Sequence, residues 1–382
     1  MSERPELPRL EFRDPARARE LVEGLRLAVD RVEGPPITLM HVCGSHEQAI
    51  ARYGLRSVLP RGLEVIMGPG CPVCITDVPE VDEAVAIARS GARVATYGDM
   101  LRVPGSRDSL ADAQAEGAQI DVVYGVDQAV ELAKSSSGEL VFFASGFETT
   151  AVATAAALLA GVPSNFSVLC AHKYIPPVME IVAEMPGSRI QGFLAAGHAA
   201  TITGWGVFEG FVRRQGLPVV VAGFEPLDIL AGLLRLVQRI VAGEATVDNA
   251  FPRCVSKDGN LRAQRALWQV FRRVGGCWRG IAHVPNGNLR LRDEWAALDA
   301  RLRFRAEIAS MARQAPSALV SRCVCGEIMA GIASPADCSL FGRECLPSDP
   351  VGACMVSMEG TCRIWHRYGT RTRPSDRVGG PR

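Results

Sequence analysis

The sequence predicts an α/β protein with two parallel-sheet units and a cysteine-rich C-terminal domain. Short apolar runs rich in β-forming residues alternate with segments of helical periodicity between residues 37 and 243. This alternation is typical of parallel sheets whose strands are joined by right-handed helical crossovers. The pattern changes near the end of the chain, where six of the twelve cysteines lie between residues 323 and 362.

The first α/β unit is expected at residues 36–135. Its apolar runs, such as ITLMHV and LEVIMG, have the length and composition of buried strands. Segments of helical periodicity follow and end at glycines such as Gly91. Strands are expected at 37–42, 63–68, 92–98 and 120–125, with helices at 48–54, 79–91 and 126–138.

The second α/β unit is expected at residues 136–245, with the polar stretch 135–139 as a linker before it. The loops SGFETT and AGFEPL each follow an expected strand and resemble each other. We therefore interpret the two units as similar in build, and a distant duplication is one interpretation of this similarity. Strands are expected at 140–145, 167–172, 190–197 and 217–223, with a long helix at 227–243.

Three further segments complete the expected organisation. Residues 1–35 form an N-terminal helical segment, and residues 246–366 form the cysteine-rich domain, with a helix expected at 293–304. Residues 367–382 are polar and rich in Pro and Gly, so we expect this tail to be disordered.

Composition excludes several classes of function. The net charge is +1 and aromatic residues make up 6%, which argues against binding to nucleic acid or to a membrane surface. No apolar run reaches the roughly 18 residues that a membrane helix needs, and the charged N-terminus shows no signal peptide. We expect a cytoplasmic protein, whose twelve cysteines then act as metal ligands, redox thiols or packing residues.

Polar and thiol side chains follow the expected strands. Ligands of open parallel sheets bind beyond the carboxyl ends of strands, so these residues are candidates for a site. No GxGxxG or GxxxxGK[ST] motif occurs in these loops, and a nucleotide is not the obvious ligand. The strand-end residues are Cys43, His46, Cys71, Cys74, Asp99, Glu148, Thr149, His172, His198 and Glu225.

Cys43 is the sharpest single candidate. In the run CGSHEQAIARYG, Ser45 lies near the expected N-cap of a helix, and dipoles at a helix start lower a thiol pKa. A lowered pKa favours the thiolate, the form that binds iron. His46 lies three residues on and is placed to donate to whatever Cys43 holds. The alternative is a buried cysteine beside a histidine with satisfied hydrogen bonds.

The segment GPGCPVC places Cys71 and Cys74 in a C-x-x-C pair. This spacing suits both reversible disulfide formation and metal binding. A structural zinc site usually needs a second pair nearby, and no such pair is adjacent in the sequence. We therefore favour a redox dithiol over zinc, with two buried core thiols as the weaker alternative.

The C-terminal cysteines have the spacing C-x-C-x12-C-x6-C-x8-C-x7-C. Four thiolates suffice for a [4Fe-4S] cluster and also for zinc, and this spacing does not decide between them. The two remaining thiols could form a disulfide. The other cysteines, Cys170, Cys254 and Cys277, have no partner motif and are interpreted as packing residues.

Several long motifs, in order along nearly the whole chain, resemble the HypD family of hydrogenase maturation factors. The motifs are HVCGSHE (41–47), GPGCPVC (68–74), SGFETT (145–150), HKYIPP (172–177), GFLAAGHA (192–199), GFEPLDIL (223–230) and the block CGEIMAGIASPADCSLFGRECLPSDPVGACMVSMEGTC (325–362). The resemblance implies two Rossmann-like α/β domains plus a third that carries a cluster. It also implies a role in building the Fe(CN)2CO group of [NiFe] hydrogenases.

The resemblance further implies partners and roles for individual residues. The partners are the small chaperone HypC and the cyanide donor HypE. Cys43 would hold the iron under assembly, and Cys71 and Cys74 would be the redox pair. The implied ligands of a [4Fe-4S] cluster are Cys325, Cys338, Cys345 and Cys362, with Cys323 and Cys354 as an accessory pair.

The strand-end residues allow a chemical hypothesis and two rival readings. His46, Asp99, Glu148 and Thr149 are candidates to hydrogen-bond cyanide nitrogens or to move protons. One rival is a thiol–disulfide reductase that contains a cluster, which would turn over a protein disulfide catalytically. The other is a zinc-stabilised binding module, which would be colourless.

Overall fold

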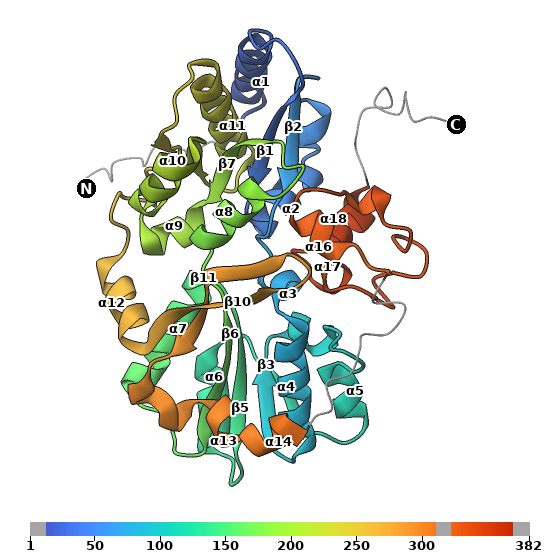
Figure 1. Ribbon diagram of the computed structural model, residues 1–382, viewed down its shortest axis with the longest axis vertical. Helices are drawn as coiled ribbons and strands as arrows, with labels where there is room; N and C mark the ends of the chain where they lie inside the picture. Colours follow the sequence, from blue (N-terminus) through green and yellow to red (C-terminus); the bar gives the residue numbers. More distant parts are fainter. Residues whose placement is uncertain (1–12, 311–321, 370–382) are drawn as a thin grey trace, which may run out of the picture.

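The computed structural model describes residues 13–310 and 322–369. Two parallel sheets lie one above the other, and the C-terminal segment packs against one side of the region between them (Figure 1). The predicted α/β class with two parallel-sheet units is confirmed.

Among the described residues, the upper sheet in Figure 1 has five strands, all paired in parallel. Strand β1 lies between β2 and β7 and is buried along its whole length, which agrees with its mostly apolar sequence. In spatial order, the strands are β2 (Leu63–Met67), β1 (Ile37–His41), β7 (Ile190–Ala196), β8 (Val219–Ala222) and β9 (Val247–Asn249).

The lower sheet has four described strands, also parallel. Strands β5 and β6 are fully buried along their length, as their apolar runs LVFFAS and SVLCAH predict. In spatial order, the strands are β4 (Ile120–Val122), β3 (Arg93–Thr96), β5 (Leu140–Gly146) and β6 (Phe166–His172).

The chain passes twice between the sheets. It builds β1 and β2 in the upper sheet, then all of the lower sheet, and returns to the upper sheet at β7. Each sheet therefore takes strands from both of the segments expected from the sequence, 36–135 and 136–245. The stretch 135–139, expected as a linker, joins α6 to β5 within the lower unit. A strand's apolar pattern is the same in either sheet, so local sequence does not reveal which sheet a strand joins.

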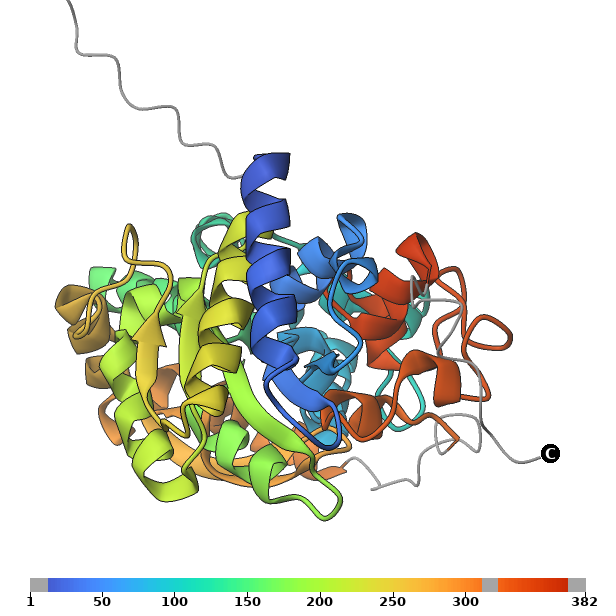
Figure 2. The same cartoon turned by 90° about the horizontal axis from the view of Figure 1, so that it is seen from above.

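Helices cover both faces of the upper sheet. Helix α11 packs on β7 and β8 and also beside α1, as Figure 2 shows. The opposite face is covered by the helices that follow β7. The helices around the upper sheet are α1 (Pro15–Val29), α2 (Gly44–Arg52), η1 (Leu55–Ser57), α8 (Pro176–Glu184), α9 (Gly197–Thr203), η3 (Trp205–Phe208), α10 (Glu209–Gln215) and α11 (Pro226–Val241).

The lower sheet is covered in the same way by the helices between its strands. Helix α4 starts at a capping box in which Asp77 and Glu80 satisfy each other's backbone N–H groups. Helices α6 and α7 pack on the face of β5, with α12 outside α7. The elements are α3 (Pro72–Ile75), α4 (Val78–Arg89), η2 (Gly98–Arg102), α5 (Leu110–Ala115), α6 (Val126–Lys134) and α7 (Glu148–Ala160).

A β-hairpin follows the two sheets. The segment 293–304, expected as one helix, is a 3-10 helix and a short α-helix, because Asp299 caps a new helix start in its middle. The hairpin strands pair antiparallel. The elements are α12 (Leu261–Val270), β10 (Phe271–Trp278), β11 (Ala282–Leu291), η4 (Asp293–Leu298), α13 (Ala300–Arg303) and α14 (Arg305–Ser310).

The C-terminal segment packs on the helices that follow β1 and β2. Helix α18 contacts α2, while α16 and α17 contact α3. Helix α18 continues to Tyr368 and so includes the first two residues of the expected tail; residues 370–382 lie outside the described residues. The elements are α16 (Cys325–Met329), η5 (Pro335–Asp337), α17 (Ala353–Val356) and α18 (Thr361–Tyr368).

The helices in the described part of the chain are all too short or too polar to span a lipid bilayer.

The loops after β1 and β2 lie backbone against backbone. The Gly44 N–H donates to the Gly70 carbonyl at 3.1 Å. A Cβ on Gly70 would overlap the backbone of Val42 and Cys43, so only glycine fits this position without movement.

We expect Gly70→Ala to lower the free energy of unfolding by at least about 2 kcal/mol, because the added methyl group would force the two loops apart. Gly138→Ala is the matched control, since a Cβ there meets open space, and its effect should stay within about 0.5 kcal/mol. Denaturant unfolding of both variants measures the difference. Equal stability of the two variants would contradict the close packing.

Candidate functional site

The structure brings Cys43 and the C-x-x-C pair together. Cys43 caps the N-terminus of α2, directly after β1, and Cys71 caps α3, shortly after β2. The two loops share the Gly44–Gly70 hydrogen bond, and Cys43, Cys71 and Cys74 are all buried in one core cluster. The carboxyl ends of adjacent parallel strands therefore place Cys43 beside the Cys71–Cys74 pair, as the sequence predicted.

The environment of Cys43 corrects one expectation. The residue itself is the N-cap of α2, rather than lying before a cap near Ser45, and the nearby backbone N–H groups of Ser45 and His46 act to lower the pKa of its thiol. These donors favour the thiolate, but burial and the nearby Glu359 carboxylate outweigh them and raise the pKa of Cys43 to about 12. The predicted lowering of the pKa is therefore wrong for the iron-free chain.

His198 is the side chain nearest to the Cys43 sulfur among the described contacts. Its Nδ1 lies 3.9 Å from Cys43 Sγ, and burial lowers the pKa of its imidazole. His198 starts α9 after β7, the strand beside β1, so its strand-end position was visible in the sequence. Its contact with Cys43 was not visible in the sequence, because only the pairing of β1 with β7 reveals that the two loops are neighbours.

His46 is a link between loops rather than a donor to Cys43. Its Nε2 donates to the Gly223 carbonyl at 2.9 Å, and its ring packs on Phe224. Burial lowers the pKa of His46 to about 3, so the ring is neutral. Its Nδ1 is buried without a partner and can only accept a hydrogen bond. His198 also packs on the Phe224 ring, so the two histidines contact the same aromatic side chain.

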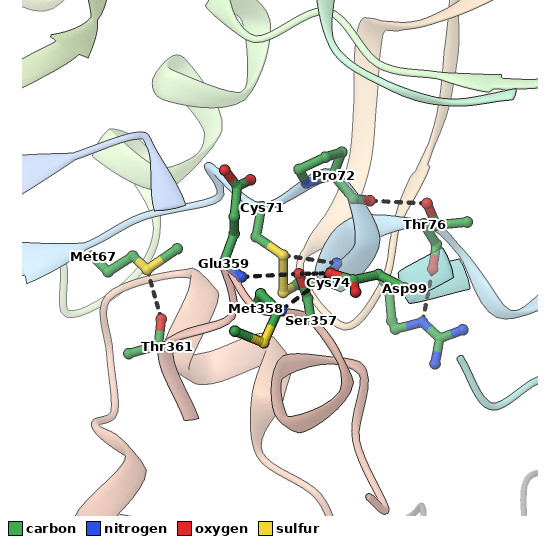
Figure 3. Close-up of a disulfide and its surroundings, with 11 residues drawn as sticks. Met67, Cys71, Pro72, Cys74, Thr76, Asp99, Ser357, Met358, Glu359 and Thr361 are labelled. Atoms are coloured by element: carbon green, nitrogen blue, oxygen red, sulfur yellow. Dashed lines mark hydrogen bonds between the residues drawn. A yellow bond between two sulfur atoms is a disulfide. The ribbon is translucent and has the colours of Figure 1, made fainter. Parts of the chain in front are cut away.

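Cys71 and Cys74 form a disulfide in this structure (Figure 3). The Cys71 sulfur accepts the backbone N–H of Cys74, closing the first turn of α3. Pro72 at the first helical position has no N–H to satisfy and favours this turn. A short helix thus holds both sulfurs at its N-terminal end.

The segment Ser357–Glu359 lies beside this disulfide (Figure 3). Asp99, a predicted site residue, accepts hydrogen bonds from the Ser357 hydroxyl and the Met358 N–H, both at 3.1 Å. Glu359 accepts from the Ser45 hydroxyl at 3.1 Å. Asp99 therefore joins the lower sheet to the C-terminal segment, and Glu359 joins that segment to the Cys43 loop.

A buried carboxylate beneath Cys43 fixes the same loop. Glu47 is fully buried and accepts from His41 Nε2, Arg56 and Trp365 Nε1 at 2.7–2.9 Å. Burial alone would raise the pKa of Glu47, but Arg56 and His41 hold it far below its ordinary value. His41 Nδ1 also hydrogen-bonds the Cys43 carbonyl at 3.2 Å, so the same ring joins Glu47 to the Cys43 loop.

The C-terminal thiols gather around Cys325. The Cys323 thiol donates to Cys325 Sγ at 3.1 Å, and Cys354 and Cys362 each share a hydrogen bond with Cys325. Hydrogen bonds from Cys325 and Cys354 lower the pKa of Cys362 to about 6. Cys345 is close enough for the charges of Cys323 and Cys325 to raise its thiol pKa, although burial is the larger cause.

These contacts bear on whether the residues fit an iron–sulfur cluster. The donor set is suitable, because five cysteine thiols converge and one favours the thiolate form. A Cβ on Gly352 would lie 2.5 Å from the sulfurs of both Cys323 and Cys325, so the chain leaves this space to sulfur. Across residues 13–310 and 322–369, however, no three His, Cys, Asp or Glu side chains already have the arrangement of metal ligands.

The predicted division of these cysteines stays a prediction. Cys354, assigned to the accessory pair with Cys323, instead contacts Cys325 and Cys362. Cys338, assigned as a ligand, is half-buried in the loop that leads to Cys345 and makes none of the described thiol contacts. Of the three cysteines expected to be packing residues, Cys170 is buried, but Cys254 and Cys277 are exposed.

The remaining strand-end residues have separate environments. Glu148 starts α7 and is fully buried: its Oε1 accepts the Ile175 N–H at 2.8 Å, and its Oε2 has no partner. Burial raises the pKa of Glu148 to about 7. Thr149 is half-buried in the next position of α7. His172 bonds Thr154 at 2.9 Å, while Glu225 caps α11 and pairs with Arg13, which are structural contacts.

Comparison with known proteins agrees with this thiol-rich α/β site. Residues 16–369 match the family described as HypD, "Hydrogenase formation hypA family". A hydrogenase maturation factor HypD of Azotobacter vinelandii is 42% identical, over 94% of this chain and 96% of its own. A putative hydrogenase expression/formation protein of Methanocaldococcus jannaschii is 39% identical, over 94% of this chain and 99% of its own.

The chain is thus of the class of hydrogenase formation proteins. It belongs to the HypD family of hydrogenase maturation factors.

The buried Glu148 predicts a pH-dependent stability. Its folded-state pKa of about 7 lies above the unfolded value, so its contribution to stability is greatest below pH 4.5 and is lost as pH rises toward 7. Glu148→Gln keeps the bond from Ile175 and removes this loss. The variant should therefore gain on the order of 2 kcal/mol relative to wild type between pH 5 and pH 8.

Denaturant unfolding across that pH range measures this gain. Glu131→Gln is the matched control, because Glu131 is exposed and pairs with Lys134 on the helix surface. If the free energies of unfolding of Glu148→Gln and wild type change with pH in parallel from pH 5 to pH 8, the pKa of Glu148 is not raised by burial.

Proposed function

We propose that this protein is the scaffold on which the iron of a hydrogenase active site receives its cyanide and CO ligands. Cys43 holds the iron, which is the substrate of the process, together with a cysteine of a small HypC-type chaperone. The observation that supports this most directly is the contact between the Cys43 loop and the Cys71–Cys74 turn through the Gly44–Gly70 hydrogen bond.

The surroundings of Cys43 suit iron binding. The Ser45 and His46 N–H groups already face its sulfur and favour the thiolate that iron requires. His198 Nδ1, 3.9 Å away and neutral because of burial, is placed to take the proton that Cys43 loses when iron binds. Burial of the sulfur keeps water from competing for the metal.

The Cys71–Cys74 pair supplies the electrons for cyanide transfer. A HypE-type donor carries cyanide as a thiocyanate, R–S–C≡N. Two thiols reduce this S–C bond: R–SCN and two Cys–SH give R–SH, HCN and the Cys71–Cys74 disulfide. The cyanide then binds the iron as CN⁻ and releases one proton. The disulfide in this structure corresponds to the oxidised product of this step.

A [4Fe-4S] cluster would be held by four of the gathered C-terminal thiols. The resemblance to the family implies Cys325, Cys338, Cys345 and Cys362 as ligands, and the contacts make Cys354 a further candidate. When bound, such a cluster supplies electrons one at a time at low potential. The fold brings these cysteines close to the redox pair, because α16 and α17, which carry Cys325 and Cys354, pack directly on α3.

We expect Cys43→Ala to abolish iron loading while leaving the C-terminal chromophore intact. The variant is co-expressed with the small chaperone, purified without oxygen, and examined by infrared and visible spectroscopy. The cyanide and CO stretching bands should vanish and the visible absorption should match wild type. Cys170→Ala is the control, because Cys170 is also buried but lies in the lower sheet.

The outcomes separate this proposal from its rivals. Infrared bands that survive in Cys43→Ala would show that another residue holds the iron. Catalytic reduction of a protein disulfide by both wild type and Cys43→Ala would favour the thiol–disulfide reductase. A colourless wild-type protein containing zinc would favour the binding module.

A further inference from the structure

Arg279 joins the redox pair to the C-terminal thiols. It sits at the tip of the β10–β11 hairpin, between Trp278 and Gly280. We propose that Arg279 is a positioning residue that holds the Cys71–Cys74 turn and places a positive charge between that turn and the C-terminal thiols. This inference deepens the proposed function and rests on its assignment of Cys71 and Cys74 as the redox pair.

The geometry of Arg279 is specific to the dithiol turn. Its backbone N–H donates to the Ile75 carbonyl at 3.1 Å, and its Nε donates to the Thr76 carbonyl at 2.7 Å. Nη2 donates to the Pro104 carbonyl at 2.7 Å. Ile75 and Thr76 end the helix whose start carries both sulfurs, so Arg279 satisfies carbonyls at the C-terminal end of α3.

The hairpin tip is rigid enough to fix this position. Trp278 is buried, and its Nε1 donates to Asn288 Oδ1 at 3.1 Å across the hairpin. Gly280 turns the chain at φ +67° and packs directly against the backbone of Gly326, the residue after Cys325. The tip is therefore wedged between α3 and α16, where a side chain on Gly326 would not fit.

The charge of Arg279 lies near the C-terminal thiols, while its side chain binds the end of the Cys71–Cys74 turn. Cys323 and Cys325 act electrostatically on the guanidinium, as do the carboxylates of Asp77 and Asp82. A guanidinium stays protonated even when buried, so its charge is permanent. The Cys71–Cys74 pair gains negative charge when it is reduced and one of its thiols then loses a proton. The C-terminal cysteines, which are already free thiols, gain negative charge by losing a proton. A fixed cation nearby stabilises the thiolates of both groups.

The test compares reduction of the disulfide by glutathione in charge-removing and charge-keeping variants. The reaction is balanced: the Cys71–Cys74 disulfide and two glutathione thiols give two cysteine thiols and one glutathione disulfide. The full-length chain is equilibrated without oxygen, iron or partners, and the thiols are trapped by alkylation and counted by mass spectrometry. Arg279→Gln should shift the equilibrium about tenfold toward the disulfide, or roughly 30 mV.

Arg279→Lys separates charge from positioning. It keeps the cation but cannot reach both carbonyls, so its equilibrium should stay within about threefold of wild type. Hydrogen exchange at the backbone of residues 74–77 should nevertheless become faster. Arg93→Gln is the control, since Arg93 pairs with Asp121 on the lower sheet, and both measurements should match wild type.

Two results would overturn the inference. One is an Arg279→Gln protein whose equilibrium is unchanged or moves toward the dithiol. The other is an Arg279→Lys protein with unchanged hydrogen exchange in the turn. Neither result depends on iron loading, so they are distinct from failure of the proposed function, which Cys43→Ala tests.

Discussion

The close approach of two backbone loops is the constraint on which the candidate site depends. Gly70 lies against the backbone of Cys43, and the Gly44 N–H bonds the Gly70 carbonyl. Because β1 and β2 are adjacent parallel strands, their carboxyl ends emerge at the same edge, and glycine lets the two loops touch. Cys43, the proposed iron ligand, and the Cys71–Cys74 pair therefore lie side by side because of strand order and because Gly70 has no side chain.

The C-terminal segment completes this site from the side. Gly44 faces Glu359, since a Cβ there would lie 2.5 Å from the Glu359 side chain. The buried carboxylate of Glu47 bonds Trp365, three residues beyond Cys362, and so joins the same loop to the C-terminal segment. The same carboxylate also pairs with Arg56 and His41. Removing one member of such a network leaves a buried charge unpaired, which costs several kcal/mol. The thiol-rich segment is thus held to the Cys43 loop by specific polar contacts as well as by packing.

The sequence predicts the elements of the fold better than their assembly. Apolar runs such as LVFFAS marked most strands within two residues of their observed bounds, because burial and β-propensity are local properties. The strand expected at 120–125 is an exception, since β4 ends three residues earlier, at Val122. Which sheet receives a strand depends on pairing across distant segments, so the return of the chain to the upper sheet at β7 was not visible. The contact between Cys43 and His198 depends on the same pairing. The pKa of Cys43 failed as a prediction because helix-start dipoles were visible in the pattern, whereas its complete burial was not.

The central claim is that Cys43, the Cys71–Cys74 pair and the C-terminal thiols line one site in which iron is assembled. Anomalous diffraction at the iron absorption edge, on crystals of the chain loaded with iron beside its small chaperone, tests it most directly. We expect an isolated iron bonded to the Cys43 sulfur, on the side that faces the Cys71–Cys74 turn. It should be separate from any iron among the C-terminal cysteines. An isolated iron bound elsewhere, for example at exposed Cys254 or Cys277, with none at Cys43, would contradict it.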